Sequence, residues 1–221
     1  MALRLLMLGP PGAGKGTQAA RVAGEHGVPK ISTGDMLRNA VASGSSLGHL
    51  VKETVARGEL VSDDLIVALV AERLKEADAA AGFVLDGFPR TVPQAEALDG
   101  LLNGAALTVL EIRVPDDELV RRVRGRRICE RCGTTVSAFD GDPALAQACK
   151  VCGGRLVQRS DDSEQVVRDR LKIYWRETQP MIGFYEGRTT FRRIDGAQSP
   201  LAVYQAIATA VAEMCGKETA Q

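Results

Sequence analysis

The chain has 221 residues, of which 45% are hydrophobic, so it is long enough to bury the core of one large domain with small insertions. Its 28 basic residues balance 28 acidic ones, so no net positive field attracts nucleic acid or an anionic membrane. No stretch has transmembrane length, and the apolar start runs into a glycine-rich turn rather than a cleavage site. We therefore expect a cytoplasmic protein without nucleic-acid or membrane partners.

Short apolar runs alternate with longer amphipathic segments along the chain. Runs that do not alternate apolar and polar residues are typical of strands buried on both faces of a parallel sheet. These runs are residues 3–8, 83–85, 107–114 and 190–194, with 30–31 as a further short strand. The pattern predicts an α/β fold, in which helices cover both faces of a central parallel sheet in a three-layer α/β/α core.

Two segments interrupt this alternation. Residues 32–61 have a helical pattern without a strand, and residues 125–162 are rich in cysteine, glycine and polar side chains. We expect both to be insertions in one core, which consists of residues 1–31, 62–124 and 163–221.

A glycine-rich loop, Gly-Pro-Pro-Gly-Ala-Gly-Lys-Gly-Thr at residues 9–17, lies between the first expected strand and a helical pattern. Backbone N–H groups of such a loop turn toward a phosphate, the helix directs its positive end at it, and Lys15 adds a charge. ATP or GTP is the expected ligand, and a turn that only connects strand and helix is the alternative. Because Gly16 stands where Ser or Thr usually holds Mg²⁺, we expect the ion to be held mainly through water and nucleotide oxygens.

A second anionic site is predicted after the strand at 83–85. Asp86 and Arg90 follow this strand, and ligands of open α/β sheets bind at the carboxyl ends of strands. Asp86 can orient water around Mg²⁺, and Arg90 can bind a phosphate with two N–H groups. A turn with a surface salt bridge is the alternative.

The helix expected from about Ser163 places an arginine on its apolar face. At 100° per residue, Arg170 lies between Val166 and Val167 in angle. The rest of this predicted face is Leu171, Ile173, Tyr174 and Trp175. An inward arginine indicates an anionic partner, which is either a bound phosphate or a carboxylate such as Asp161 or Asp162.

Two Cys-x-x-Cys pairs, Cys129/Cys132 and Cys149/Cys152, are separated by 16 residues. Four thiolates on two tight turns favour a closed tetrahedral Zn²⁺ site with a structural role, because this insertion is too short to build a core alone. Iron or cobalt could occupy the same ligands, and four free thiols are the remaining alternative.

The chain resembles the adenylate kinase family through four motifs in the family's order. They are residues 9–17, Ile-Ser-Thr-Gly-Asp-Met-Leu-Arg at 31–38, Asp-Gly-Phe-Pro-Arg at 86–90 and Gly-Arg-Arg at 125–127. The resemblance covers nearly the whole chain. It implies an AMP-binding insertion at 32–61, a zinc-binding lid at 125–162 that closes over ATP, and a monomer. The implied reaction is MgATP + AMP ⇌ 2 ADP, by direct in-line transfer without a covalent enzyme intermediate.

The same resemblance implies roles for individual residues. The catalytic set is Lys15, Arg38, Asp86, Arg90, Arg126, Arg159 and Arg170. The ATP site adds Gly12, Ala13, Gly14, Gly16, Thr17, Arg122, Thr135, Val136 and Gln198 to Lys15 and Arg126. The AMP site adds Thr33, Leu60, Val61, Gly87 and Gln94 to Arg38, Arg90, Arg159 and Arg170, with Gln94 reading the adenine edge.

Two other functions stay open at this stage. A kinase of the same fold could act on UMP, CMP or GMP. A nucleotide-switched binding protein could use a four-cysteine module to dock nucleic acid or another partner, although the zero net charge and the lack of aromatic residues among the basic ones argue against nucleic acid.

Overall fold

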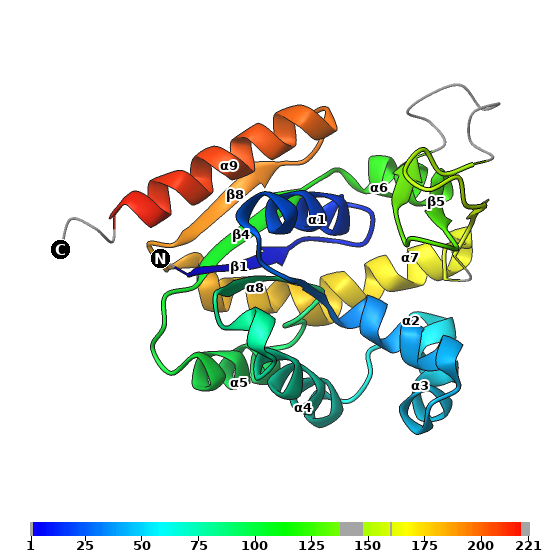
Figure 1. The fold of residues 1–221 in the computed structure, drawn as a ribbon, viewed down its shortest axis with the longest axis horizontal. Helices are drawn as coiled ribbons and strands as arrows, with labels where there is room; N and C mark the ends of the chain where they lie inside the picture. Colours follow the sequence, from blue (N-terminus) through cyan, green and yellow to red (C-terminus); the bar gives the residue numbers. More distant parts are fainter. Residues whose placement is uncertain (1, 138–147, 160, 218–221) are drawn as a thin grey trace.

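Five parallel strands form the centre of the protein, in the order β2-β3-β1-β4-β8 (Figure 1). The computed structural model describes residues 2–137, 148–159 and 161–217. The strands are β1 (Leu3–Leu8), β2 (Lys30–Ser32), β3 (Gly82–Asp86), β4 (Thr108–Arg113) and β8 (Phe191–Asp195). The predicted parallel sheet is therefore confirmed, and each expected apolar run contributes one strand.

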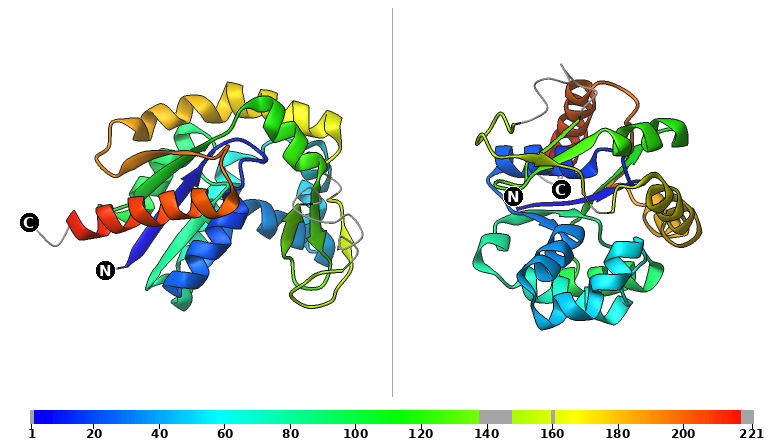
Figure 2. Two further views of the ribbon diagram at one scale, coloured as in Figure 1. Left: turned by 90° about the horizontal axis from the view of Figure 1, so that it is seen from above. Right: turned by 90° about the vertical axis from the view of Figure 1, so that its right-hand side faces the viewer.

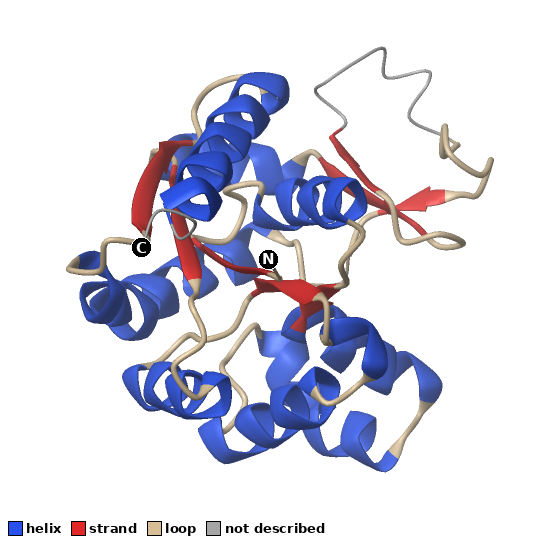
Figure 3. Cartoon of the chain, turned by 60° about the vertical axis from the view of Figure 1, so that its left-hand side comes forward, coloured by secondary structure: helices blue, strands red, loops and turns tan. Residues whose placement is uncertain are grey.

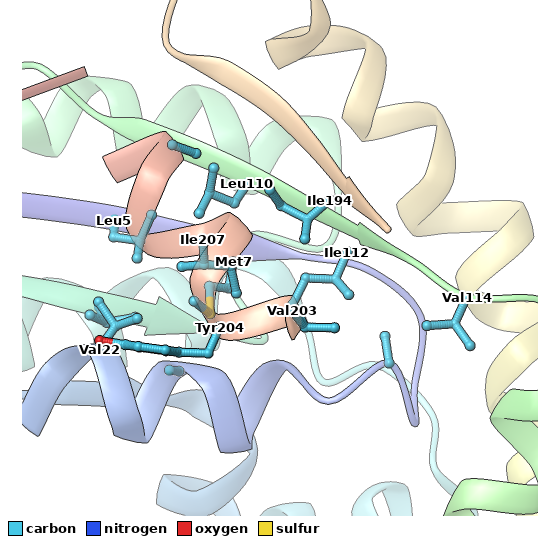
Figure 4. Packing of buried hydrophobic residues seen from close by; sticks show 14 of the residues in the cluster. Leu5, Met7, Val22, Leu110, Ile112, Val114, Ile194, Val203, Tyr204 and Ile207 are labelled. Atoms are coloured by element: carbon cyan, nitrogen blue, oxygen red, sulfur yellow. The ribbon is translucent and has the colours of Figure 1, made fainter. Parts of the chain in front are cut away.

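Side chains of β1 alternate between two hydrophobic clusters, one on each face of the sheet. Leu5 and Met7 pack in the cluster that also contains Val22 and Ile207 (Figure 4). Leu6 belongs to the opposite cluster. A strand that is buried on both faces must be apolar at successive positions, which explains the unbroken apolar run at the start of the sequence.

Helices cover both faces of this sheet. On the first face α1 (Lys15–His26) and α9 (Pro200–Lys217) lie side by side (Figure 2). The opposite hydrophobic cluster includes side chains of α4 (Asp63–Leu74), α5 (Val92–Leu102) and α8 (Gln179–Glu186). The remaining helices are α2 (Thr33–Ser43), α3 (Ser46–Arg57), α6 (Asp116–Arg124), α7 (Glu164–Ile173) and the short 3₁₀ turn η1 (Ala77–Ala79). None of the helices in the described ranges has both the length and the hydropathy needed to cross a membrane.

The helical pattern at 32–61 forms two helices, α2 and α3. Gly44 ends α2 in the left-handed region at φ 65°, and Ser45 caps α3 by accepting from the Gly48 N–H. A Cβ atom on Gly48 would lie 2.0 Å from the Ala40 carbonyl oxygen, so only glycine permits this close crossing.

A small antiparallel sheet stands apart from the central one (Figure 3). Its strands, in the order β6-β5-β7, are β5 (Arg126–Cys129), β6 (Thr135–Ser137) and β7 (Leu156–Val157). All three belong to the cysteine-rich segment, of which residues 138–147 and 160 lie outside the described part of the chain.

The helix that begins after Ser163 contains a π turn. Segment η3 (Tyr174–Thr178) is π-helical and joins α7 directly to α8. Val167, Leu171 and Tyr174 are buried as predicted, but Trp175 is 47% exposed, so its assignment to the apolar face is wrong. At 100° per residue Trp175 lies about 100° from Tyr174, at the edge of the predicted face, where a side chain can remain in contact with solvent.

Candidate active site

The phosphate loop joins β1 to α1 and leaves the first N–H groups of the helix without a side-chain cap. Gly14 is the N-cap residue, with φ 91°. A Cβ atom on Gly12, which has φ 88°, would lie 2.7 Å from a methyl carbon of Val123, so glycine lets the loop pack against α6. Uncapped N–H groups and the helix dipole together make this loop suited to an anion.

Lys15 closes this loop on itself. Its Nζ donates to the carbonyl oxygens of Gly9 at 2.7 Å and of Pro10 at 2.9 Å. Burial, with smaller contributions from neighbouring arginines such as Arg90 and Arg170, lowers its pKa to about 8 against the attraction of Asp86. A phosphate placed here would remove this electrostatic conflict.

Five arginines converge on the loop from separate parts of the chain. They are Arg38 on α2, Arg90 after β3, Arg126 on β5, Arg159 after β7 and Arg170 on α7. Burial, with the charge of Arg170, lowers the pKa of Arg90 to about 10. Burial, followed by the charges of Arg38 and Arg126, lowers the pKa of Arg159 to about 10 as well. Mutual repulsion of this kind indicates a site built for a highly charged anion.

Asp161 and Asp162 offset part of this positive charge. Arg170 Nη1 donates to Asp161 Oδ2 at 2.7 Å, and Arg126 Nε donates to Asp162 Oδ2 at 2.7 Å. The carboxylate alternative considered for Arg170 is thus present, yet Arg170 also lines the cleft described below. Two buried atoms, Arg159 Nε and Asp161 Oδ1, have no hydrogen-bond partner in the described part of the chain.

Asp35 is the member of this network that the sequence did not single out. Against the opposing effect of burial, hydrogen bonds from Lys30 at 2.9 Å and Arg38 at 2.6 Å hold its pKa well below the usual range. Its backbone N–H donates to Ser32 Oγ, which caps α2. The Ser-x-x-acid spacing at the start of a helical pattern was the available signal.

These groups line a cleft of about 830 Å³ that reaches from the phosphate loop to the small antiparallel sheet. Among the predicted site residues, it is lined by Gly12, Ala13, Gly14, Lys15, Gly16, Thr17, Arg38, Asp86, Gly87, Arg90, Arg122, Arg126, Thr135, Val136, Arg159, Arg170 and Gln198. Asp86 stands beside the loop, since a Cβ atom on Gly16 would lie 3.2 Å from its Oδ2. One cleft therefore gathers the expected phosphate, arginine and lid residues.

The remaining predicted residues lie at or behind one wall of this cleft. Leu60 lines an adjoining cavity of about 70 Å³ that shares Lys15, Gly87, Arg90 and Arg170 with the main cleft. Val61 is half-buried next to Leu60.

Thr33 and Gln94 are buried behind the lining residues. Thr33 Oγ1 and Arg90 Nε both donate to the Gly87 carbonyl oxygen, each at 2.8 Å. The side chain of Gln94 accepts from the Arg90 backbone N–H.

The residues at the outer end of the cleft are polar, and some of them form hydrogen bonds with one another. Arg122 Nε donates to Glu118 at 2.8 Å, and Gln198 Nε2 donates to Asp195 at 3.2 Å. The Ala197 backbone N–H also donates to Asp195, at 2.9 Å, so this loop is held in a turn by its own aspartate.

The four cysteines lie close together on two turns that have the same backbone conformation. The Gly133 N–H donates to the Cys129 carbonyl and the Gly153 N–H donates to the Cys149 carbonyl, with φ 70° and 73° at the two glycines. All four Sγ atoms lie within 4.8 Å of one another, and the Cys129–Cys152 and Cys132–Cys149 pairs are 3.4 and 3.5 Å apart. Zn–S bonds of about 2.3 Å in a tetrahedron separate sulfurs by about 3.8 Å, so the donor set fits zinc.

Comparison with known proteins agrees with this arrangement. A family model described as "Adenylate kinase" matches residues 7–190. An adenylate kinase of Archaeoglobus fulgidus is 45% identical over 208 residues, covering 93% of this chain and 96% of that protein. An adenylate kinase of Trichlorobacter lovleyi is 47% identical over 214 residues, covering 96% and 100%. With nearly full-length similarity in addition to the converging arginines and the four-cysteine cluster, the chain belongs to the adenylate kinase family.

Proposed function

We propose that this protein catalyses MgATP + AMP ⇌ 2 ADP by direct in-line transfer of the γ-phosphoryl group. The observation that carries the proposal is the convergence of Lys15 and five arginines on one cleft large enough for two nucleotides. Phosphoryl transfer asks the protein mainly to align two nucleotides and to offset the charge on the moving group. Direct transfer between two bound nucleotides needs no covalent enzyme intermediate.

The roles follow from the position of each group. The phosphate loop and Lys15 hold the β- and γ-phosphates of ATP, while Arg122, Thr135, Val136 and Gln198 contact the rest of that nucleotide. Arg38 and Arg90 hold the phosphate of AMP, whose base lies toward Leu60, Val61 and Gln94. Arg126, Arg159 and Arg170 face both nucleotides and offset the charge that develops between them.

Mg²⁺ fits beside Asp86, which lines the cleft next to Gly16. When bound with ATP, the ion would offset phosphate charge, and Asp86 would hold its water ligands. Zn²⁺ fits the four cysteines, where it would hold the small sheet together without a chemical role.

We infer a division into a core of residues 1–31, 62–124 and 163–221, an AMP-binding insertion at 32–61 and a lid at 125–162. The separate sheet β6-β5-β7 and the helix pair α2–α3 support these boundaries. Closure of both insertions over the nucleotides would exclude water and so prevent hydrolysis of ATP, and adenylate kinases are themselves a familiar example of enzymes with such lids. Two moving insertions favour a monomer, and four reduced thiols favour a cytoplasmic location.

The test is ³¹P NMR of the protein with MgATP and, in separate samples, AMP, UMP, CMP or GMP. ADP formation with AMP alone is expected. Turnover with a different monophosphate instead of AMP would change the proposed acceptor nucleotide but leave the proposed mechanism unchanged. No turnover in any sample, with folded and metal-loaded protein, would favour the nucleotide-switched binding protein.

A further inference from the structure

Asp63, the first residue of α4, holds the side chain of Gln94 on α5. Gln94 Nε2 donates to Asp63 Oδ1 at 2.7 Å, across 31 positions of sequence. The second carboxylate oxygen accepts from Thr91 Oγ1 at 2.9 Å. Gln94 is only 2% exposed, so its amide has few alternatives to these partners.

The neighbours of the Gln94 side-chain oxygen and of its nitrogen favour the same orientation of the amide. Its Oε1 accepts from the Arg90 backbone N–H at 2.8 Å, while its Nε2 faces the Asp63 carboxylate. A backbone N–H can only donate and an ionised carboxylate can only accept, so the orientation of the amide follows from its neighbours. A flipped amide would place oxygen against carboxylate and N–H against N–H.

One N–H and one oxygen lone pair of the amide remain for a ligand. The Watson–Crick edge of adenine offers an acceptor at N1 beside a donor at the 6-amino group, which matches this orientation. The 6-oxo purines offer the reverse, a donor at N1 beside an acceptor at O6, and would require the flipped amide. The remaining N–H and lone pair of the Gln94 amide can therefore distinguish adenine from the 6-oxo purines only while the amide cannot rotate.

We propose that Asp63 is a positioning residue that sets the base selectivity of the monophosphate site by locking the Gln94 amide. This inference rests on the proposed role of Gln94 as the reader of the base. Asp63 does not need to touch the nucleotide.

The test compares AMP with IMP, because hypoxanthine has the shape of adenine but the reversed donor and acceptor at positions 1 and 6. In Asp63→Asn the new amide can either accept from or donate to Gln94, so the flipped orientation becomes accessible without a change of volume. We expect the ratio of the IMP to the AMP dissociation constant, from competition calorimetry, to fall about tenfold, with ATP affinity unchanged. Asp63→Glu, which keeps a carboxylate, should retain most of the ratio.

Asp64→Asn is the matched control, since it removes the same charge from the same helix turn at an exposed position. It should leave the ratio unchanged. Gln94→Leu should lower the ratio at least as far as Asp63→Asn, and Asp63→Ala provides a second variant if Asp63→Asn does not fold.

Two different results would overturn the inference. If Gln94→Leu lowers the ratio but neither Asp63→Asn nor Asp63→Ala does, Gln94 reads the base without help from Asp63. If Gln94→Leu itself leaves the ratio unchanged, the base is read elsewhere, and the proposed role of Gln94 fails together with the inference.

Discussion

At the scale of single residues, Lys15 shows a direct conflict between charge and burial. Within the described residues its hydrogen-bond partners are two carbonyl oxygens, and burial together with the nearby arginines lowers its pKa to about 8. In a complex with ATP the phosphates would favour the protonated amine and raise this pKa again. ATP binding and protonation of Lys15 are therefore linked.

We expect ATP affinity to fall as the pH rises above 8. Free protein loses the Lys15 proton through that pH, whereas the complex keeps it, so binding must take up a proton and weakens by up to about tenfold per pH unit. Calorimetry in buffers of different ionisation enthalpy should show uptake of about one proton at pH 9 and little at pH 7. Lys15→Arg should abolish that uptake, and a pH-independent ATP affinity up to pH 9.5 would contradict the assignment.

Arg90→Ala is expected to abolish most phosphoryl transfer while ATP affinity stays nearly intact. Arg90 lies outside the phosphate loop, and loss of one preorganised cation costs about 10²- to 10³-fold in rate. Turnover by ³¹P NMR and ATP binding by calorimetry separate the two effects. Arg168→Ala, at an exposed arginine paired with Glu164, is the control, and normal turnover of Arg90→Ala would refute the role.

How much the sequence predicts depends on how local the contacts are. The strand-loop-helix pattern around Lys15 predicts the phosphate loop, because all its parts are adjacent in sequence. The hydrogen bonds that connect Arg90 to Gln94 and Gln94 to Asp63 could not be predicted in the same way, because Asp63 and Gln94 are 31 positions apart in the sequence. Side-chain hydrogen bonds between distant segments follow no period that could be counted in one sequence.

At the scale of elements, the small sheet β6-β5-β7 depends on its cysteines. Its strands are two to four residues long, and Cys129 and Cys149 are the buried members of the four-cysteine cluster beside it. Such a sheet buries too little apolar surface to be stable alone. The two knuckles, each closed by a glycine with positive φ, would supply the missing stability once they share a metal ion.

Cys149→Ser is expected to release the metal and to lower the melting temperature by roughly 5 °C, because three thiolates hold zinc more weakly and the small sheet loses its crosslink. Elemental analysis and calorimetry would measure the two effects. Val151→Ser changes an exposed residue, 74% accessible, on the same turn and should alter neither. Wild-type protein purified without metal would defeat this prediction.

Element types and approximate positions were predictable, but breaks within helices were not. The pattern at 32–61 is helical throughout, whereas the chain turns at Gly44 into two crossing helices. The face assigned to Val167, Leu171 and Tyr174 is correct, and the error is Trp175, which lies at the edge of that face within the π turn. A count at a fixed angle detects a face but cannot detect a change of pitch.

At the scale of the whole molecule, ion pairs connect the expected AMP insertion to the end of the expected lid. Asp161 lies 2.7 Å from Arg170 and 3.6 Å from Arg38, and Arg159 lies 3.8 Å from Asp35. Each of the three arginines could exchange its present carboxylate partner for a phosphate. Binding of both nucleotides should therefore rearrange contacts across the cleft rather than within one insertion.

A bisubstrate compound, two adenosines joined by a chain of phosphates, is expected to bind at least about 100-fold more tightly than ATP, because it engages both sites at once. Hydrogen exchange should show protection of α2, α3 and the small sheet with the compound, but of the small sheet alone with ATP. Helix α9 provides the internal reference. Equal affinity for ATP and the bisubstrate compound would favour a nucleotide switch with one site.

The π turn at Tyr174–Thr178 also bears on how this chain can vary in length. A π turn is equivalent to one residue inserted into an α-helix and absorbed in one wide turn, so removal of one residue there would restore regular α-helix and leave α8 in the same orientation relative to α7. Met181 and Tyr185, both fully buried, would then stay in the core. A deletion within α8 itself has no such turn to absorb it and would rotate the side chains that follow by about 100°, so the π turn is the point in this helix where the chain length can differ by one residue.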